Sequence, residues 1–146
     1  MSGRQVASVC VRYAVAGAAA GLGWRAVEPV LRRLFGHPYS DPELLTAFIT
    51  RGVAQRPLDY LVQGTGGAAF GWTFARLGGR TTRQAVAASL GENALLLAAA
   101  GVVDRYHPDV RDGSWPPLAG NPRAAGVSVS GHLLYGVLLG MLAKRR

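Results

Sequence analysis

Four mostly apolar stretches, each about as long as a membrane span, alternate with more polar connections along the chain. They cover residues 6–24, 58–77, 84–103 and 124–143. About 20 apolar residues in a helix cross the hydrocarbon core of a bilayer, because each residue advances the helix by about 1.5 Å. In the last stretch only His132 and Tyr135 carry titratable side chains. The pattern predicts an all-α protein, a four-span transmembrane helical bundle forming a single integral membrane domain over 1–146.

The connection between the first two stretches is too long for a bare loop. Asp41, Pro42 and Glu43 form a typical helix start, with a capping side chain, a proline in the first turn and an acid near the positive end. Apolar residues on one face then continue the pattern to about Ala54, which predicts a short amphipathic capping helix. The proline-rich connection over 104–123 predicts an ordered loop without regular structure.

Small residues four positions apart recur in every apolar stretch. These pairs are Gly17/Gly21, Gly67/Gly71, Ala87/Gly91 and Gly136/Gly140. Residues four apart lie on one face of a helix, and glycine there lets a second backbone approach closely. Since glycine inside a helix in water costs about 1 kcal/mol relative to alanine, the pattern favours helix packing in a membrane. The same faces are candidates for contact with a second copy or with another membrane protein.

A weak internal repeat relates the two halves, 1–72 and 73–146. A shift of 70 residues superimposes His37-Pro38 on His107-Pro108, and a shift of 69 superimposes Gly67 on Gly136. Repeats of one orientation occur in membrane transporters. Chance alignment in a sequence rich in glycine and alanine is the alternative explanation.

Basic residues lie mostly at the ends of the apolar stretches, although the net charge is +8. They form no stripe with interleaved aromatic residues, which argues against nucleic-acid binding. The chain termini and the connection between the second and third stretches are basic and lack acidic residues, which favours a cytoplasmic location for all three. We therefore expect a multi-pass protein of the bacterial inner (plasma) membrane with both termini cytoplasmic and membrane lipid as its surroundings.

Two apolar stretches contain a full charge, Arg12 in the first and Glu92 in the third. Their similar depth predicts an Arg12–Glu92 ion pair, because an unpaired charge inside a membrane costs about 3 kcal/mol or more. This pair either locks two helices together, or Glu92 is a proton-handling carboxylate or part of a polar substrate site. Asn93 points about 100° away from Glu92 and is expected to bridge helices by hydrogen bonding. A soluble alanine-rich bundle is the alternative if one stretch is not a span.

His132 and Tyr135 lie three residues apart on nearly the same face of the last stretch. An interhelical hydrogen bond, a proton relay with Glu92 and an axial ligand to a porphyrin are the three roles considered for His132. Asp104 and His107 form a second candidate acid–base pair near a membrane edge. With one cysteine and no HxxxH or HExxH spacing, the sequence predicts no metal site, and it assigns no cofactor.

The last stretch, His132-Leu-Leu-Tyr135-Gly136-Val-Leu-Leu-Gly140, resembles the H-L-x-Y-G-x-x-x-G helix of YagU-like bacterial inner-membrane proteins. The second stretch looks like the same helix with Gln63 at the histidine position, and the first is similar to the Gly/Ala-rich opening span of that family. The resemblance covers less than a third of the chain and implies a small polytopic membrane protein.

The sequence favours a non-enzymatic role, as an accessory, assembly or packing component of the membrane. A small transporter or proton-coupled protein that uses Arg12, Glu92 and His132 is the first alternative. A membrane enzyme acting on a lipidic substrate, with Glu92 or the Asp104/His107 pair as acid or base, is the second.

Overall fold

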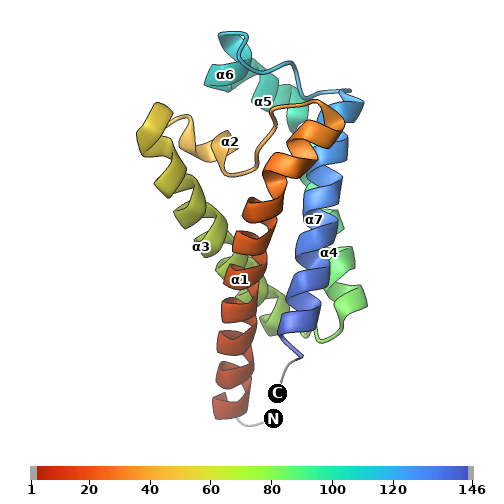
Figure 1. Ribbon diagram of the computed structural model, residues 1–146. Helices are drawn as coiled ribbons and strands as arrows, with labels where there is room; N and C mark the ends of the chain where they lie inside the picture. Colours follow the sequence, from red (N-terminus) through yellow and green to blue (C-terminus); the bar gives the residue numbers. More distant parts are fainter. Residues whose placement is uncertain (1–2, 145–146) are drawn as a thin grey trace.

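The computed structural model describes residues 3–144, and all regular elements in this range are helical. Four long helices run alternately up and down, and shorter helices lie between them toward one end (Figure 1). The long helices are α1 (Gly3–Phe35), α3 (Gln55–Arg76), α4 (Thr82–Ala98) and α7 (Pro122–Leu142). The short ones are α2 (Glu43–Thr46), η1 (Gly52–Ala54), α5 (Ala100–Tyr106) and α6 (Pro108–Arg111). The all-α prediction is confirmed.

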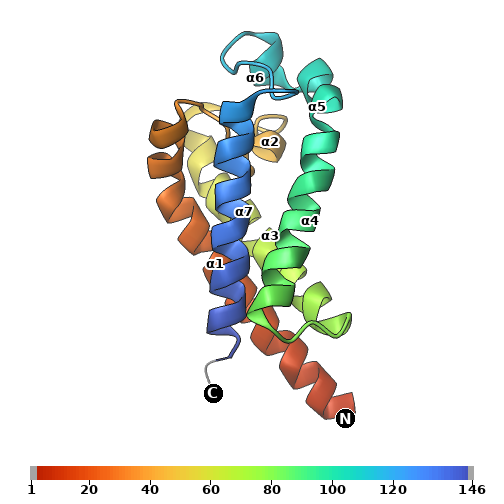
Figure 2. The same cartoon turned by 90° about the vertical axis from the view of Figure 1, so that its right-hand side faces the viewer.

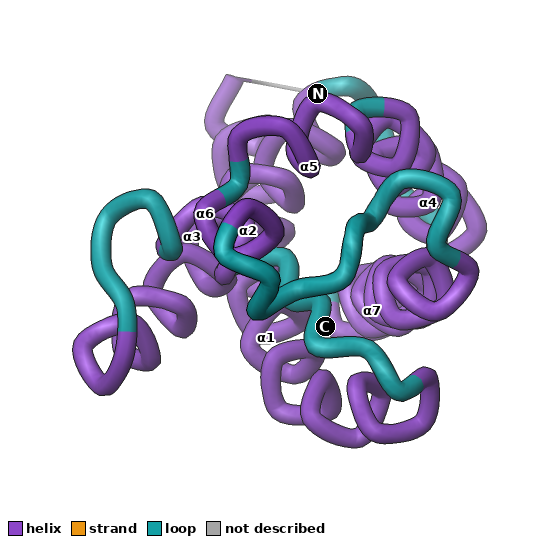
Figure 3. The backbone as a smooth tube through the Cα atoms, turned by 90° about the horizontal axis from the view of Figure 1, so that it is seen from above, coloured by secondary structure: helices purple, strands orange, loops and turns teal. Residues whose placement is uncertain are grey.

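The long helices form an arc in the order α3, α1, α7, α4, because α1 packs against α3 and α7, and α7 packs against α4 (Figure 3). Helices α3 and α4 therefore lie at opposite ends of the arc. The start of α1 and the end of α7 lie at the same end of the bundle, while α2, α5 and α6 lie toward the other (Figures 1 and 2). We call the end with the short helices the upper end.

Two helices, α1 and α7, are long and apolar enough to cross a membrane. A third crossing is added if α4 and α5, which meet at a 51° bend, form one broken span. Helix α3 is long enough, with 22 residues, but is not apolar enough to be counted as a span. It carries Arg56, Asp59 and Gln63 in its first half. The expectation of a membrane protein is thus supported by two or three spans.

Local sequence signals explain where the helices begin. The Asn121 side chain accepts hydrogen bonds from the backbone N–H groups of Arg123 and Ala124, and Pro122 occupies the first turn of α7. Thr81 and Gln84 form a capping box at the start of α4. These caps fix where α4 and α7 begin, and the two helices pack against each other.

The stretch 84–103, expected to be one helix, is bent at Ala99. The N–H of Ala99 is shared between the carbonyl oxygens of Leu95 and Leu96, at 3.0 and 3.1 Å. The bend turns Ala100 into an upper hydrophobic cluster, where it is 4% exposed. Burial of the α5 residues in this cluster therefore accompanies the break.

The predicted amphipathic helix is shorter than expected, since α2 contains only Glu43–Thr46. Asp41 does not cap it; the Asp41 carboxylate accepts a hydrogen bond from the Tyr39 hydroxyl instead. Arg51 is extended, and Gly52, the first residue of η1, adopts a φ of +75°, a left-handed conformation that favours glycine. The connection 104–123 also differs from expectation, because α5 and α6 extend into it.

Glycines permit close backbone contact where α1 crosses α3. A Cβ atom added to Gly17 would collide with the carbonyl oxygen of Gly67, and one added to Gly67 would collide with that of Gly17. Gly21 faces the carbonyl oxygen of Gln63, only 2.6 Å from an added Cβ, and Gly71 faces Tyr13 in the same way. Backbone atoms cannot move aside as a side chain can, so larger residues here would push α1 and α3 apart.

The α4–α7 crossing uses Gly136 and Gly140 on α7, which face Val86 and Thr82 on α4. The small pair Ala87/Gly91 on α4 lies on another face, and an added Cβ on Gly91 would meet nothing within 4 Å of the described chain. The buried residues of α4 are Ala85, Ser89 and Asn93, spaced four apart, and the side chains of Ser89 and Asn93 donate hydrogen bonds to α7. A role of Ala87/Gly91 in binding a second copy stays a prediction.

A buried ionic cluster holds α2 against the upper parts of α1 and α3. Arg25 lies 2.9 Å from the Glu28 carboxylate and 3.1 Å from the Asp59 carboxylate. Arg32 lies 2.9 Å from Glu43, the first residue of α2. Glu28 and Asp59 are only 1% and 2% exposed, so their charges depend on these arginines.

Candidate functional site

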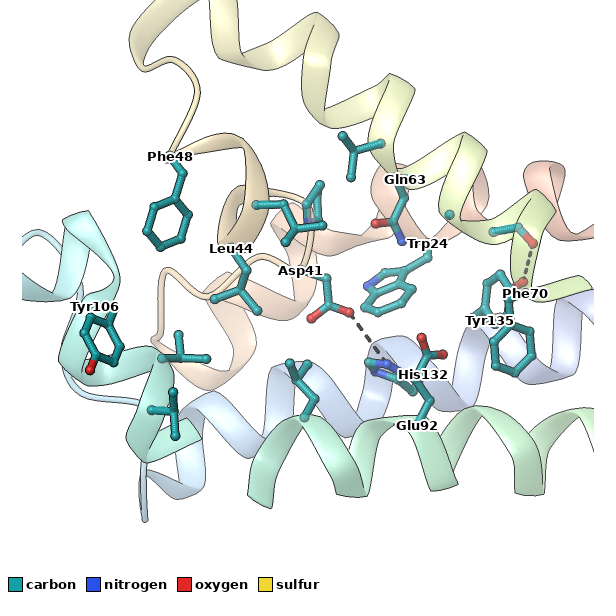
Figure 4. Close-up of a pocket in the computed structure, with 18 residues that line it drawn as sticks. Trp24, Asp41, Leu44, Phe48, Gln63, Phe70, Glu92, Tyr106, His132 and Tyr135 are labelled. Carbon is teal, nitrogen blue, oxygen red and sulfur yellow. Dashed lines mark hydrogen bonds and ion pairs between the residues drawn. The ribbon is translucent and has the colours of Figure 1, made fainter. Parts of the chain in front are cut away.

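A cavity of about 500 Å³ lies between α3 and α4, on the inner side of the arc. Most of the side chains that line it are apolar; Gln63 lines it as well, and we call Asp41, Glu92 and His132 its polar wall (Figure 4). Small-molecule sites typically have volumes of about 300–1,000 Å³ and combine apolar walls with a few placed polar groups. The size and lining of this α3–α4 cavity match that description.

His132 is 3% exposed and projects from the middle of α7. Its Nδ1 lies 2.9 Å from the carbonyl oxygen of Ser128, and its Nε2 lies 3.7 Å from an Asp41 carboxylate oxygen. A chain of hydrogen bonds continues from there: Tyr39 donates to Asp41, Ser128 to Tyr39, and Asn93 to Ser128. The network ties the connection after α1 to both α4 and α7.

The contacts of His132 indicate where its protons lie. Nδ1 lies 2.9 Å from the Ser128 carbonyl oxygen, which only accepts, and 3.3 Å from the Asn93 amide nitrogen, so the shorter contact favours a proton on Nδ1. Nε2 lies 3.7 Å from Asp41, which is longer than a hydrogen bond and makes an ion pair when His132 is protonated. Burial raises the pKa of the Asp41 carboxyl to about 7, although the hydrogen bond from Tyr39 acts to lower it. When one proton is held by either Asp41 or Nε2, the pair has no net charge.

Glu92 is the remaining charged group of the polar wall. It forms no hydrogen bond and no ion pair with any residue in 3–144, and its carboxyl group lies beside His132 in the cavity (Figure 4). The ion pair predicted between Arg12 and Glu92 is absent from the described chain, since Arg12 is exposed and its guanidinium lies 5.9 Å from the Tyr13 ring centre. Glu92 is thus available to a ligand.

Aromatic rings surround the polar wall. The Trp24 ring meets His132 edge to face at 4.8 Å between ring centres, and Phe70 meets Tyr135 at 5.4 Å. The Tyr135 hydroxyl donates to the carbonyl oxygen of Gly67 at 2.8 Å, which ties α7 to α3 below the cavity. The Trp24 indole N–H is buried without a hydrogen-bond partner within 3–144.

The structure separates the second candidate acid–base pair. The Asp104 carboxylate accepts from the backbone N–H groups of Leu118 and Ala119, at 2.7 and 2.8 Å. His107 is fully buried and stacks on Trp115 at 4.9 Å between ring centres. Each side chain therefore stabilises the folded loop, and the two do not act on a common group.

No group of three or more His, Cys, Asp or Glu side chains within residues 3–144 has the geometry of a metal site. An axial bond from His132 to a porphyrin iron would require displacement of a partner, because Nδ1 faces Ser128 and Nε2 faces Asp41. The donor set therefore fits hydrogen bonding better than metal ligation.

Sequence reasoning identified Glu92, Asn93, His132 and Tyr135 but missed Asp41 as a partner of His132. The missing signal was spatial, because the two residues are 91 positions apart and Asp41 resembled an ordinary helix cap. Trp24, at the end of the first apolar stretch, is 5% exposed and also lines the cavity.

Comparison of the chain with protein-family models, with curated proteins and with solved structures finds no match. The resemblance to YagU-like proteins therefore rests on the glycine-rich helices alone, and the case for function rests on the α3–α4 cavity and its polar wall.

Proposed function

We propose that the protein is a multi-pass membrane protein that binds a lipid-soluble molecule in the α3–α4 cavity. The observation that carries this proposal is the coexistence of an apolar volume of about 500 Å³ with a polar wall formed by Asp41, Glu92 and His132. The apolar lining suits a hydrocarbon group, and the polar wall suits a head group. Binding without chemical conversion agrees with the non-enzymatic role expected from the sequence.

A role limited to helix packing accounts less well for the polar wall. Burying a polar group costs free energy unless it is paired, and a charge in a membrane interior costs several kcal/mol. Asp41 and His132 pair with each other, but Glu92 faces the cavity with no hydrogen-bonding partner among residues 3–144. A purely structural bundle has no need of that carboxyl group, whereas a binding site does.

We also propose that all four long helices cross the membrane as two copies of one helix pair. The close contacts support this repeat, because the pairs Gly67–Gly17 and Gly136–Val86 are related by a shift of 69 residues. The same shift relates Gly71–Tyr13 to a fourth pair, Gly140–Thr82.

The two histidines that precede prolines add independent support for the repeat. The Nδ1 of His37 accepts from the backbone N–H of Tyr39, and the Nδ1 of His107 accepts from that of Asp109. Both histidines are buried, and each uses the same ring nitrogen to bond the residue two positions later. On this proposal α3 crosses the membrane beside α1 despite its polar first half.

Membrane topology is tested by single cysteines at Arg83 and Ala119, which are both exposed. Arg83 lies at the lower end with both termini, and Ala119 lies in the upper loop before α7. A membrane-impermeant maleimide should label Ala119→Cys in intact cells and Arg83→Cys only after lysis. Cys10 is 2% exposed and gives little background. Labelling of both sites from the same side would mean that α4 and α5 do not cross the membrane, and would refute the four-span topology.

Ligand binding is tested by filling the cavity. Gly66 lines it and has no atom within 4 Å of an added Cβ, so Gly66→Leu should place a side chain in the volume without disturbing the fold. Gly91→Leu is the matched control, because Gly91 is equally open but does not line the cavity. Native mass spectrometry of protein extracted in lipid nanodiscs should detect a bound lipid-soluble molecule in wild type and Gly91→Leu. If Gly66→Leu retained as much of the bound molecule as wild type, the proposed binding in this cavity would be wrong.

A further inference from the structure

We infer that the α3–α4 cavity selects an amphiphilic cation, such as a long-chain amine or quaternary ammonium compound, and holds its charge at Glu92. This inference rests on the proposed function, since it names the class of molecule that the same cavity binds. It follows from three features: the sign of the charges that face the cavity, the aromatic rings around them and the apolar side chains that line the rest of it.

The charges facing the cavity are of one sign. None of the described side chains that line it is Lys or Arg. The titratable groups that face it are Asp41 from the connection, Glu92 from α4, His132 and Tyr135 from α7 and Tyr106 from α5. When one proton is held by either Asp41 or the Nε2 of His132, the pair is neutral, and an ionised Glu92 gives the site a net charge of −1.

The nearest arginine cluster does not offset this charge. Arg25 is paired with Glu28 and Asp59, and Arg32 is paired with Glu43. An anionic head group such as a carboxylate or phosphate would therefore meet Glu92 without a basic partner, which is unfavourable in an apolar medium. A cation meets an opposite charge there.

Aromatic faces strengthen the preference for a cation. Trp24, Phe70 and Tyr135 line the cavity close to the polar wall (Figure 4). The negative face of an aromatic ring attracts a cation, with tryptophan the most effective. The apolar side chains of Leu44 and Leu96 also line the cavity and suit the hydrocarbon part of the ligand.

Binding of such a cation is an exchange for a proton. A cation with a permanent charge requires the Glu92 carboxylate, because the neutral acid offers it no opposite charge. Where Glu92 carries a proton in the empty cavity, that proton passes to solvent when the cation binds, and one positive charge replaces another. By linkage the affinity for the cation rises with pH, by up to about tenfold per pH unit while the proton is still bound in the empty state.

The test uses three brominated dodecyl probes with the same chain: the trimethylammonium salt, the alcohol and the sulfate. Bromine quenches tryptophan emission on contact, and Trp24 is the tryptophan that lines the cavity. Quenching is measured in nanodiscs of zwitterionic lipid, and Trp24→Phe gives the background from Trp72 and Trp115. Comparing variants at equal probe concentration cancels the partition of each probe into the lipid.

We expect the trimethylammonium probe to bind wild type about tenfold or more tightly than Glu92→Gln, and the alcohol to bind both within about twofold. The pH dependence for the cation should disappear in Glu92→Gln and persist in Glu92→Asp. Glu92 is exposed to the cavity and makes no hydrogen bond to the described chain, so these variants should fold, which an unchanged melting temperature would verify.

Two results would overturn the inference in different ways. Equal quenching of Trp24 by the cation and the alcohol, or an unchanged cation affinity in Glu92→Gln, would exclude charge selection and leave the binding cavity standing. The absence of any Trp24-dependent quenching by all three probes would refute the proposed function together with this inference.

Discussion

The contact between α1 and α3 makes a quantitative prediction about two adjacent glycines. Gly66 and Gly67 are neighbours in α3, but only Gly67 faces α1. A Cβ on Gly67 would collide with the carbonyl oxygen of Gly17, approach its carbonyl carbon to 3.1 Å and lie 3.4 Å from the Tyr135 ring. A Cβ on Gly66 would meet nothing within 4 Å.

The expected difference follows from these surroundings. Gly67→Ala should lose about 1–3 kcal/mol of stability, the usual cost of overpacking against atoms that cannot move aside. Displacement of α3 would also strain the hydrogen bond of 2.8 Å from the Tyr135 hydroxyl to the Gly67 carbonyl oxygen. Gly66→Ala should gain up to about 1 kcal/mol, because alanine is the better helix former. The two variants should therefore differ by roughly 1–4 kcal/mol, the sum of these effects.

Thermal unfolding in one mild detergent, followed by the helical circular dichroism signal, compares the two variants directly. Gly67→Ala should melt several degrees below wild type, and Gly66→Ala at or above it. If Gly67→Ala were as stable as Gly66→Ala, the close approach of α1 and α3 would be wrong, and with it the helix arc that forms the cavity.

Three further predictions concern charged groups outside the long apolar helix faces. Asp59→Ala should destabilise the fold by about 3–5 kcal/mol in chemical denaturation, because it removes the buried partner of Arg25. As a control, Arg51→Ala breaks the exposed pair with Asp112 and should cost at most about 1 kcal/mol. The raised pKa of Asp41 means that the folded chain binds this proton more tightly than the unfolded chain. The free energy of unfolding should therefore fall as pH rises from about 4 to about 7, by up to about 1.4 kcal/mol per unit, and Asp41→Asn should flatten this slope in pH-dependent melting. Asp104→Ala should lower stability by about 1.5–3 kcal/mol through its lost hydrogen bonds and leave quenching of Trp24 unchanged; a loss of ligand binding at unaltered stability would instead revive a direct role for Asp104.

Helix content and approximate helix positions could be predicted because they depend on local patterns. The apolar stretch 124–143 and the helix α7 (Pro122–Leu142) nearly coincide, since an asparagine cap and a proline fix where the helix starts. Elements that depend on contacts with distant residues could not be predicted as well from the sequence. The bend at Ala99 and the single turn of α2 accompany packing against residues far away in the sequence.

The glycine pairs illustrate both sides of this limit. Spacing alone marked Gly17 and Gly67 as positions for close approach, and these two do lie against each other. Spacing also marked Ala87 and Gly91, yet Gly136 and Gly140 of α7 face Val86 and Thr82, and an added Cβ on Gly91 would meet nothing within 4 Å in the described chain. A helix with small residues on more than one face offers several possible interfaces, and only the partner helix selects among them.

By itself the sequence determined an all-helical chain, its apolar stretches and a short set of polar residues within them, because hydrophobic periodicity and capping are local properties. Only the tertiary structure decided which of those polar residues share a site. The sequence predicted an Arg12–Glu92 pair, but the structure groups Glu92 with Asp41 and His132. The connection after α1 folds back onto α7 and places Asp41 beside the middle of that helix. The depth of a residue in its own helix does not say which face it occupies or what a distant loop brings beside it. That placement leaves Glu92 as the carboxyl group of the cavity that has no partner among residues 3–144, which is the basis for the proposed ligand.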